Sequence, residues 1–109
     1  MIENLRFDDK GLIPAVIQDE KTSDVLTLCY MNRDALLRTV ETGRVHVFRR
    51  SLGRLTMKGE TSGCVQGVKS IYVDCENNSL LVKVEQTGVA CHSGNWSCYH
   101  SKIWGDGQR

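Results

Sequence analysis

Two cysteines and two histidines gather in the stretch TGVACHSGNWSCYH at positions 87–100. Cys91 and Cys98 follow a C-x6-C spacing, unlike the C-x2-C of zinc ribbons, and Cys75 lies sixteen residues before Cys91. Three thiolates with one open position would suit a catalytic zinc ion, whereas a fourth ligand from His92 or His100 would close a structural site. Spacing alone leaves three interpretations open: a zinc site, a set of buried thiols, or a reactive cysteine.

The chain has five cysteines, an odd number, and its N-terminus has no signal-peptide pattern. We therefore expect a cytoplasmic protein, and because cytoplasmic thiols stay reduced, a disulfide framework is disfavoured. Cys29 lies within an apolar run and is expected to be a core thiol. Cys64 follows GETSG and is interpreted as structural.

The segment DCENN surrounds Cys75 with oxygen donors. On an extended strand Asp74, Glu76 and Asn78 would share one face, and Cys75 would point to the other. Hard oxygen ligands suit Mg²⁺, whereas a thiolate suits Zn²⁺. A polar turn with solvated acids is the alternative explanation of the same residues.

A basic segment, RRSLGRLTMKGETSG at positions 49–63, carries Arg49, Arg50, Arg54 and Lys58 among glycines and hydroxyl residues. Guanidinium groups, hydroxyls and free backbone N–H groups are the donors that bind phosphate. The segment is not a P-loop, and a solvated basic loop would have the same composition.

Two apolar, β-branched runs predict a hairpin that positions these groups: LIPAVIQ at 12–18 and VLTLCYM at 25–31, joined by the polar connector DEKTSD. Asn32 stands where a helix N-cap would, and apolar residues at helical spacing continue until Gly43. We therefore expect one helix between these two residues.

Further strands are predicted in the second half of the chain. They lie at VHVF (45–48), around Leu55, at SIYVD (70–74) and at SLLVKVEQ (79–86), with CENN as a tight turn between the last two. After Gly88 we expect an irregular segment. The predicted fold class is α+β, mostly antiparallel sheet with one main helix.

The length and charge of the chain exclude several classes of protein. The 109 residues suffice for a single domain over positions 1–109, with one core. Fourteen basic and thirteen acidic residues leave a net charge of +1, so no overall field favours nucleic acid or an acidic membrane surface. No apolar run approaches the ~18 residues of a membrane span.

Taken in order, four segments resemble the phosphoribosyl-AMP cyclohydrolases of histidine biosynthesis, in their monofunctional form, from roughly Gly11 to Tyr99. They are GLIPAVIQD…VLTLCYMN, TGRVHVFRRS…KGETSG, DCENN and GVACHSGNWSCY. The resemblance implies a homodimer with active sites shared between subunits. It also implies a zinc ion held by Cys75 of one chain together with Cys91 and Cys98 of the other.

The same resemblance implies that Asp74, Glu76 and Asn78 bind Mg²⁺. This family usually reads D-C-D-x-D at these positions, so one carboxylate is replaced by a neutral amide here. We therefore expect Mg²⁺ to bind more weakly, or through more waters. Two other departures from the family pattern are Thr56, where a tryptophan is usual, and Cys64, where an asparagine is usual.

The reaction that the resemblance implies is zinc-dependent hydrolysis of the N1–C6 bond of N1-(5-phosphoribosyl)-AMP, which opens the adenine ring to an imidazole carboxamide nucleotide. His92, beside a cysteine ligand, is the candidate for proton transfer. Contacts with the substrate phosphates are expected from Arg50, Lys58, Thr61 and Ser62.

Two other classes compete with this interpretation. A structural Cys3His zinc module that binds a partner protein or RNA would have a closed metal site and no turnover, although the near-neutral charge and the lack of an aromatic platform on the basic segment count against RNA. A thiol enzyme would use Cys91 with His92. Adjacent strand residues point to opposite faces, so that enzyme needs the backbone to turn there.

Overall fold

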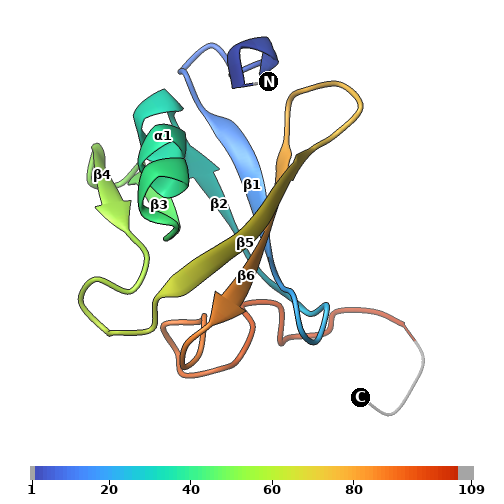
Figure 1. Ribbon diagram of the computed structural model, residues 1–109. Coiled ribbons are helices and arrows are strands. Elements are labelled where there is room, and N and C mark those ends of the chain that lie inside the picture. The colour runs from blue at the N-terminus through green and yellow to red at the C-terminus, as the bar shows by residue number, and fades with distance from the viewer. Residues whose placement is uncertain (1, 106–109) are drawn as a thin grey trace.

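Six strands and one α-helix make up the fold in the computed structural model, which describes residues 2–105 (Figure 1). A short 3-10 helix, η1 (Ile2–Asn4), precedes them. The elements are β1 (Ile13–Asp19), β2 (Val25–Met31), α1 (Arg33–Thr42), β3 (His46–Arg49), β4 (Arg54–Met57), β5 (Gln66–Val73) and β6 (Leu80–Gln86). The predicted α+β class with one main helix is confirmed.

The larger sheet has four strands in the order β2-β1-β6-β5. The β1–β2 and β5–β6 pairs are antiparallel, as predicted, and β5 begins earlier than the sequence pattern indicated. The central pair, β1 with β6, is parallel, with Ala15 opposite Leu80 and Ile17 opposite Val82. The sequence did not predict this pairing, because it joins segments at opposite ends of the chain.

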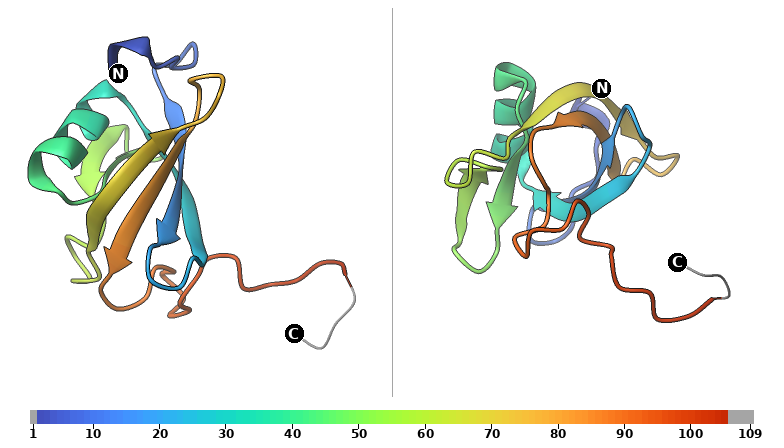
Figure 2. Two further views of the ribbon diagram at one scale, coloured as in Figure 1. Left: turned by 45° about the vertical axis from the view of Figure 1, so that its right-hand side comes forward. Right: turned by 90° about the horizontal axis from the view of Figure 1, so that it is seen from below.

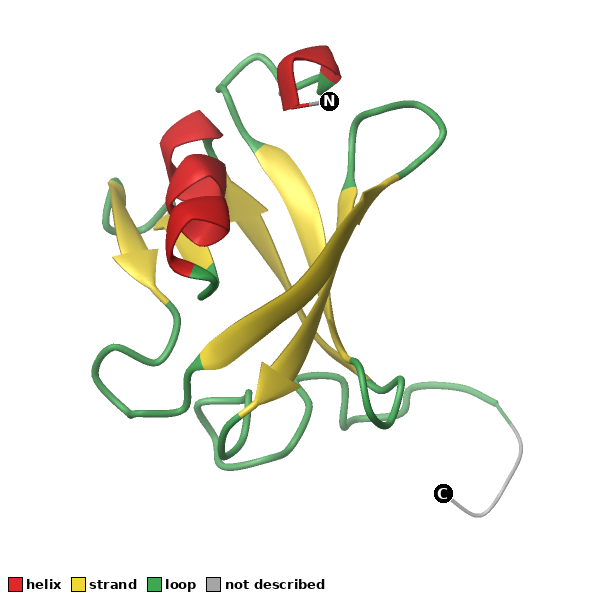
Figure 3. Cartoon of the chain, viewed as in Figure 1, coloured by secondary structure: helices red, strands yellow, loops and turns green. Residues whose placement is uncertain are grey.

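A second, two-stranded sheet is formed by the β3–β4 hairpin, in which Arg49 lies opposite Arg54. This hairpin stands beside the β2 edge of the curved larger sheet, and the chain after β6 loops back beneath both (Figure 2). The helix packs on the hairpin side, mainly against β3 (Figure 3).

The helix has the boundaries that its sequence predicted. The Asn32 side chain accepts a hydrogen bond from the Ala35 N–H at 2.8 Å and caps the first turn. Gly43 ends the helix with φ 74°, in the left-handed region that favours glycine, and its N–H donates to the Thr39 carbonyl.

One hydrophobic core is built from the larger sheet, α1 and the segment around β3. Strand β1 alternates strictly between buried and half-buried residues, which is the pattern of a strand with one face on the core. The core comprises Ile13, Ala15, Ile17, Leu26, Met31, Ala35, Leu36, Val45, Val47, Leu80, Val82 and Val84. No helix within residues 2–105 is long and apolar enough to cross a membrane.

This framework separates the predicted metal ligands within one chain. The β5–β6 turn, which carries Cys75, and the C-terminal segment with Cys91 and Cys98 lie at opposite ends of β6 (Figure 1). A strand of the length of β6 spans about 20 Å at ~3.3 Å per residue. A single chain therefore does not bring the three thiols together.

Candidate active site

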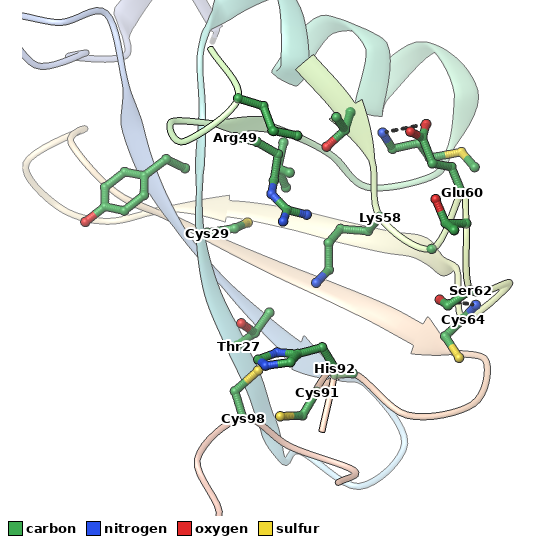
Figure 4. Close-up of a pocket in the computed structure, with 18 of the residues that line it drawn as sticks. Thr27, Cys29, Arg49, Lys58, Glu60, Ser62, Cys64, Cys91, His92 and Cys98 are labelled. Carbon is green, nitrogen blue, oxygen red and sulfur yellow. Dashed lines mark hydrogen bonds between the residues drawn. The ribbon is translucent and has the colours of Figure 1, made fainter. Parts of the chain in front are cut away.

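A cavity of about 1070 Å³ opens between β2, the β3–β4 hairpin with the basic loop after it, and the C-terminal segment (Figure 4). Its size suits a ligand as large as a nucleotide. It brings together two groups of residues that the sequence analysis had singled out separately. They are Cys91, His92 and Cys98 on one side, and Arg50, Lys58, Thr61 and Ser62 on the other.

The C-terminal segment holds its two cysteines in a tight loop fastened to the sheet. The Ala90 N–H donates to the Trp96 carbonyl and the Cys91 N–H donates to the Asn95 carbonyl, both at 3.1 Å. The Cys98 N–H donates to the Leu26 carbonyl of β2 at 2.7 Å. The backbone therefore turns between the two cysteines, so that both line the same cavity.

The Cys91 thiol lies in an environment that favours its ionised form. Its side chain is only 7% exposed, and its sulfur lies 2.9 Å from the Ser93 hydroxyl and 3.9 Å from His100 Nε2. Hydrogen bonds from the side chain and then the backbone of Ser93 lower the pKa of Cys91 to about 6, with smaller contributions from His100 and Cys98. The thiolate is the form that binds zinc or attacks an electrophile.

The contacts of Ser93 and His100 with Cys91 were not predicted. The sequence offers His100 only as a possible fourth ligand of a closed site, and the structure places its ring beside the thiol. The signal for it was the spacing Cys98-x-His100, because residues two apart on an extended segment share one face. Ser93 offered no signal apart from its position two residues after Cys91.

The pKa of Cys29 is shifted in the opposite direction to that of Cys91. Burial raises the pKa of Cys29 to about 12, and the nearby Lys58 ammonium only partly offsets this. Lys58 extends into the cavity toward the group formed by Cys91, His92 and Cys98 (Figure 4). The cavity therefore has a cationic wall on the hairpin side and a sulfur-rich wall on the C-terminal side.

Cys64 packs against both the basic loop and the segment that follows β6. Gly59 has φ +83°, and a Cβ there would lie 2.5 Å from the backbone carbon of Cys64. A Cβ at Gly88 would lie 2.6 Å from the Cys64 sulfur. Because both glycines pack against Cys64, the two loops that line the cavity hold a fixed relative position.

The DCENN segment lies away from the cavity and is not extended. Strand β5 ends at Val73, and Asp74 Oδ1 accepts hydrogen bonds from the Asn78 N–H at 2.9 Å and the Ser79 N–H at 3.2 Å. These hydrogen bonds lower the pKa of Asp74, and the bond from the Asn78 N–H has the largest effect. The predicted tight turn over CENN is confirmed, and the alternative of an extended strand with three oxygen donors on one face does not hold. The segment is instead a polar turn, in which Glu76 and Cys75 are exposed.

Within residues 2–105 no three His, Cys, Asp or Glu side chains of the single chain are arranged to hold a metal ion. Cys91 and Cys98 form two-thirds of the predicted zinc set, and Cys75 is exposed at the far turn. All five cysteines are free thiols.

Residues 27–100 match the family described as phosphoribosyl-AMP cyclohydrolase. A protein of that name from Archaeoglobus fulgidus is 51% identical over 102 residues, which cover 94% of both chains. Another, from Pelotomaculum thermopropionicum, is 47% identical over 106 residues, 97% of this chain and 82% of the relative. The histidine biosynthesis bifunctional protein HisIE of Thermoanaerobacter pseudethanolicus is 48% identical over 106 residues, 97% of this chain. This chain spans about half the length of such bifunctional relatives.

The contrast between Cys91 and Cys29 predicts selective alkylation. In the metal-free protein, the rate of Cys91 alkylation by iodoacetamide should rise with a midpoint near pH 6. The thiolate fraction increases as pH passes through the lowered pKa and is complete above it. Cys29 should stay unreactive, because its thiol ionises only near pH 12. Peptide mass spectrometry at a series of pH values from about 5 to about 9 measures both rates.

The control for this prediction is Ser93→Ala, which removes the hydroxyl beside the sulfur. Its Cys91 midpoint should move up toward the ordinary thiol value, whereas the mass increase at Cys29 should remain negligible. An unchanged midpoint in Ser93→Ala would contradict the assigned cause.

Proposed function

We propose a specific reaction for this chain, which belongs to the phosphoribosyl-AMP cyclohydrolase family: hydrolysis of the N1–C6 bond of N1-(5-phosphoribosyl)-AMP in histidine biosynthesis. Water adds to C6, the N1–C6 bond breaks and N1 takes a proton. The exocyclic nitrogen stays on the carbon as a carboxamide. The observation that carries the proposal is one cavity that is shared by ionisable thiols and the basic loop.

The charge of the cavity supports a substrate with two phosphates. Among residues 2–105, its lining contains Arg49, Arg50, Arg54 and Lys58 but a single carboxylate, Glu60. Guanidinium and hydroxyl donors are suited to phosphate oxygens. We therefore assign phosphate contacts to Arg50 and Lys58, with Thr61 and Ser62 as hydroxyl donors.

The donor chemistry of the sulfur-rich wall fits zinc. Cys91 and Cys98 line one cavity, and Cys91 has a thiol that ionises near pH 6. We propose that the third ligand is Cys75 of a second copy in a homodimer, because Cys75 is exposed and lies far from the other two in its own chain. Zinc held by three thiolates, with one open position, would lower the pKa of a water so that it can act as a nucleophile.

The residues of the chain then have separate tasks. Arg50 and Lys58 bind and orient the nucleotide against the sulfur-rich wall. His92 lines the cavity next to Cys91, and we assign to it the transfer of a proton from the attacking water. The C-terminal loop holds His92 in place through the backbone hydrogen bonds on either side of Cys91.

Magnesium is proposed at the β5–β6 turn. Mg²⁺ needs only one or two protein carboxylates and completes its shell with waters. The oxygen of Asp74 that caps the turn is Oδ1, which leaves its second carboxylate oxygen, Oδ2, as a donor to the metal. The side chains of Glu76 and Asn78 offer further oxygens. We also propose a cytoplasmic location, since five free thiols suit a reducing compartment.

Turnover that depends on zinc tests the function. The reduced, zinc-loaded protein should open the ring of N1-phosphoribosyl-AMP, followed by ultraviolet absorbance. Activity should disappear after chelation and return with added zinc. No turnover in a folded, zinc-bound protein would contradict the proposal and favour a structural module, in which His100 beside Cys91 closes the metal site.

Mixing two inactive variants tests the shared site. Cys75→Ser and Cys91→Ser should each be inactive alone, because each removes a zinc ligand from both sites of its homodimer. In a mixed dimer one site contains both lesions and the other contains neither. Subunit exchange at equal concentrations should restore about a quarter of wild-type activity, since half of the dimers are mixed.

The matched control mixes Cys91→Ser with Cys98→Ser. Cys91 and Cys98 of one site come from the same chain, so in a mixed dimer each site lacks one of these two ligands. No activity should therefore return. Recovery in this control, or none in the first mixture despite exchange verified by native mass spectrometry, would contradict a zinc site built from two chains.

A His92→Ala variant tests the proton transfer. We expect kcat to fall by about a hundredfold or more, with zinc content unchanged. Metal analysis and the pH profile of kcat measure the two effects. Full turnover with zinc bound would exclude His92 from proton transfer, and a loss of zinc would make it a ligand instead.

A further inference from the structure

The Arg50 guanidinium is stacked on an aromatic ring at the edge of the cavity. Its central carbon lies 4.2 Å from the centroid of the Tyr30 ring, within the range of a cation–π contact. Tyr30 belongs to β2, whereas Arg50 lies in the turn between β3 and β4, and both line the cavity. We propose that Tyr30 is a positioning residue that holds Arg50 in place to bind a phosphate group of the substrate.

This inference rests on the proposed function, and the way in which Arg50 is held supports it. A cation–π contact uses the charge of the guanidinium and not a hydrogen bond from its N–H groups, so these donors remain available for a bidentate contact with phosphate. A salt bridge would occupy them instead. Within residues 2–105, the Arg50 side chain has neither an ion pair nor a hydrogen bond.

The charge of Arg50 acts on the Asp8 carboxylate, but within residues 2–105 the two side chains form no ion pair. Backbone N–H groups of Leu12 and Lys10 are the main cause of the lowered pKa of Asp8, and the charge of Arg50 makes a smaller contribution. Asp8 Oδ1 accepts hydrogen bonds from these two N–H groups, at 2.9 and 2.8 Å. Within residues 2–105, the Tyr30 ring and not a carboxylate is therefore the group in contact with the guanidinium.

The two partners differ in how firmly they are anchored. Tyr30 stands between Cys29 and the fully buried Met31 on a strand that pairs with β1 along its length. Arg50 is exposed in a turn, and an exposed arginine loses rotamer freedom when it binds a ligand. A ring fixed on the sheet reduces that loss, because it orders the guanidinium before the phosphate arrives.

The chain offers a matched control in a second contact of the same kind. Lys83 lies over the Tyr72 ring at 5.3 Å from the centroid, and Tyr72 is exposed on β5, outside the cavity. Removing that ring deletes a comparable surface interaction. Tyr72→Leu should therefore leave ligand binding unchanged.

The test measures binding of AMP, ribose 5-phosphate and adenosine by titration calorimetry to the full chain. The first two ligands represent the two phosphates of the substrate, and adenosine has none. Tyr30→Leu should weaken one phosphate ligand about two- to fivefold, as expected for loss of an exposed cation–π contact, and leave adenosine unchanged. Tyr30→Phe keeps the ring and should bind as the wild type does. The KM of the substrate should rise in Tyr30→Leu with little change in kcat.

Combination with Arg50→Ala shows whether Tyr30 acts through Arg50. If it does, Tyr30→Leu has no further effect once the guanidinium is gone. Additive losses, or equal weakening of adenosine and AMP, would overturn the inference and make the ring a direct contact of the substrate. Failure of the wild-type chain to bind either phosphate ligand would overturn it too. Thermal unfolding of each variant confirms that the fold is intact.

The outcomes also separate this inference from the proposed function. If the wild type turns over its substrate while Tyr30→Leu matches it in KM and AMP affinity, the inference alone fails. The opposite outcome is that neither the wild type nor any variant opens the adenine ring, yet Tyr30→Leu lowers the affinity for a phosphate ligand through Arg50. The proposed reaction is then wrong, and the phosphate site stands.

Discussion

The parallel pairing of β1 with β6 sets the layout of the larger sheet and of the loops at its two ends. It places Ala15 against Leu80 and Ile17 against Val82, so that the two ends of the chain build one buried layer. Because β6 is fixed at the centre of the sheet, the turn before it and the segment after it must emerge at opposite ends. The separation of Cys75 from Cys91 follows from this pairing, and it is the reason why a second copy of the chain enters the proposed function.

Strand β2 plays a comparable part for the cavity. It pairs with β1 on one edge and on the other receives the β3–β4 hairpin and the C-terminal loop. The Cys98 N–H binds the Leu26 carbonyl of β2, and the Arg50 side chain rests on Tyr30 of the same strand. A cationic wall and a sulfur-rich wall thus share one rigid support, which is how a catalytic geometry is kept while its residues come from loops.

The cysteines show how surroundings decide the chemistry of one side chain. Burial without a hydrogen-bond donor for the sulfur keeps Cys29 protonated, whereas hydrogen bonds from Ser93 stabilise the thiolate of Cys91. Cys64 has a third role, since it fills the space left by Gly59 and Gly88. The sequence already predicted different roles for these thiols from their positions, and their burial and hydrogen-bond partners give the physical reason for the difference.

Local sequence patterns predicted the β1–β2 hairpin, the helix from the Asn32 cap to Gly43, and the candidate residues of both cavity walls. Those features depend on bonds and side-chain patterns within a few residues, so they can be predicted without knowing the fold. Three features could not be predicted in this way: the parallel β1–β6 pair, the approach of His100 to Cys91 and the contact of Arg50 with Tyr30. Each of them joins groups whose spacing along the chain says nothing about their distance in space, because packing of the core, not local conformation, brings them together.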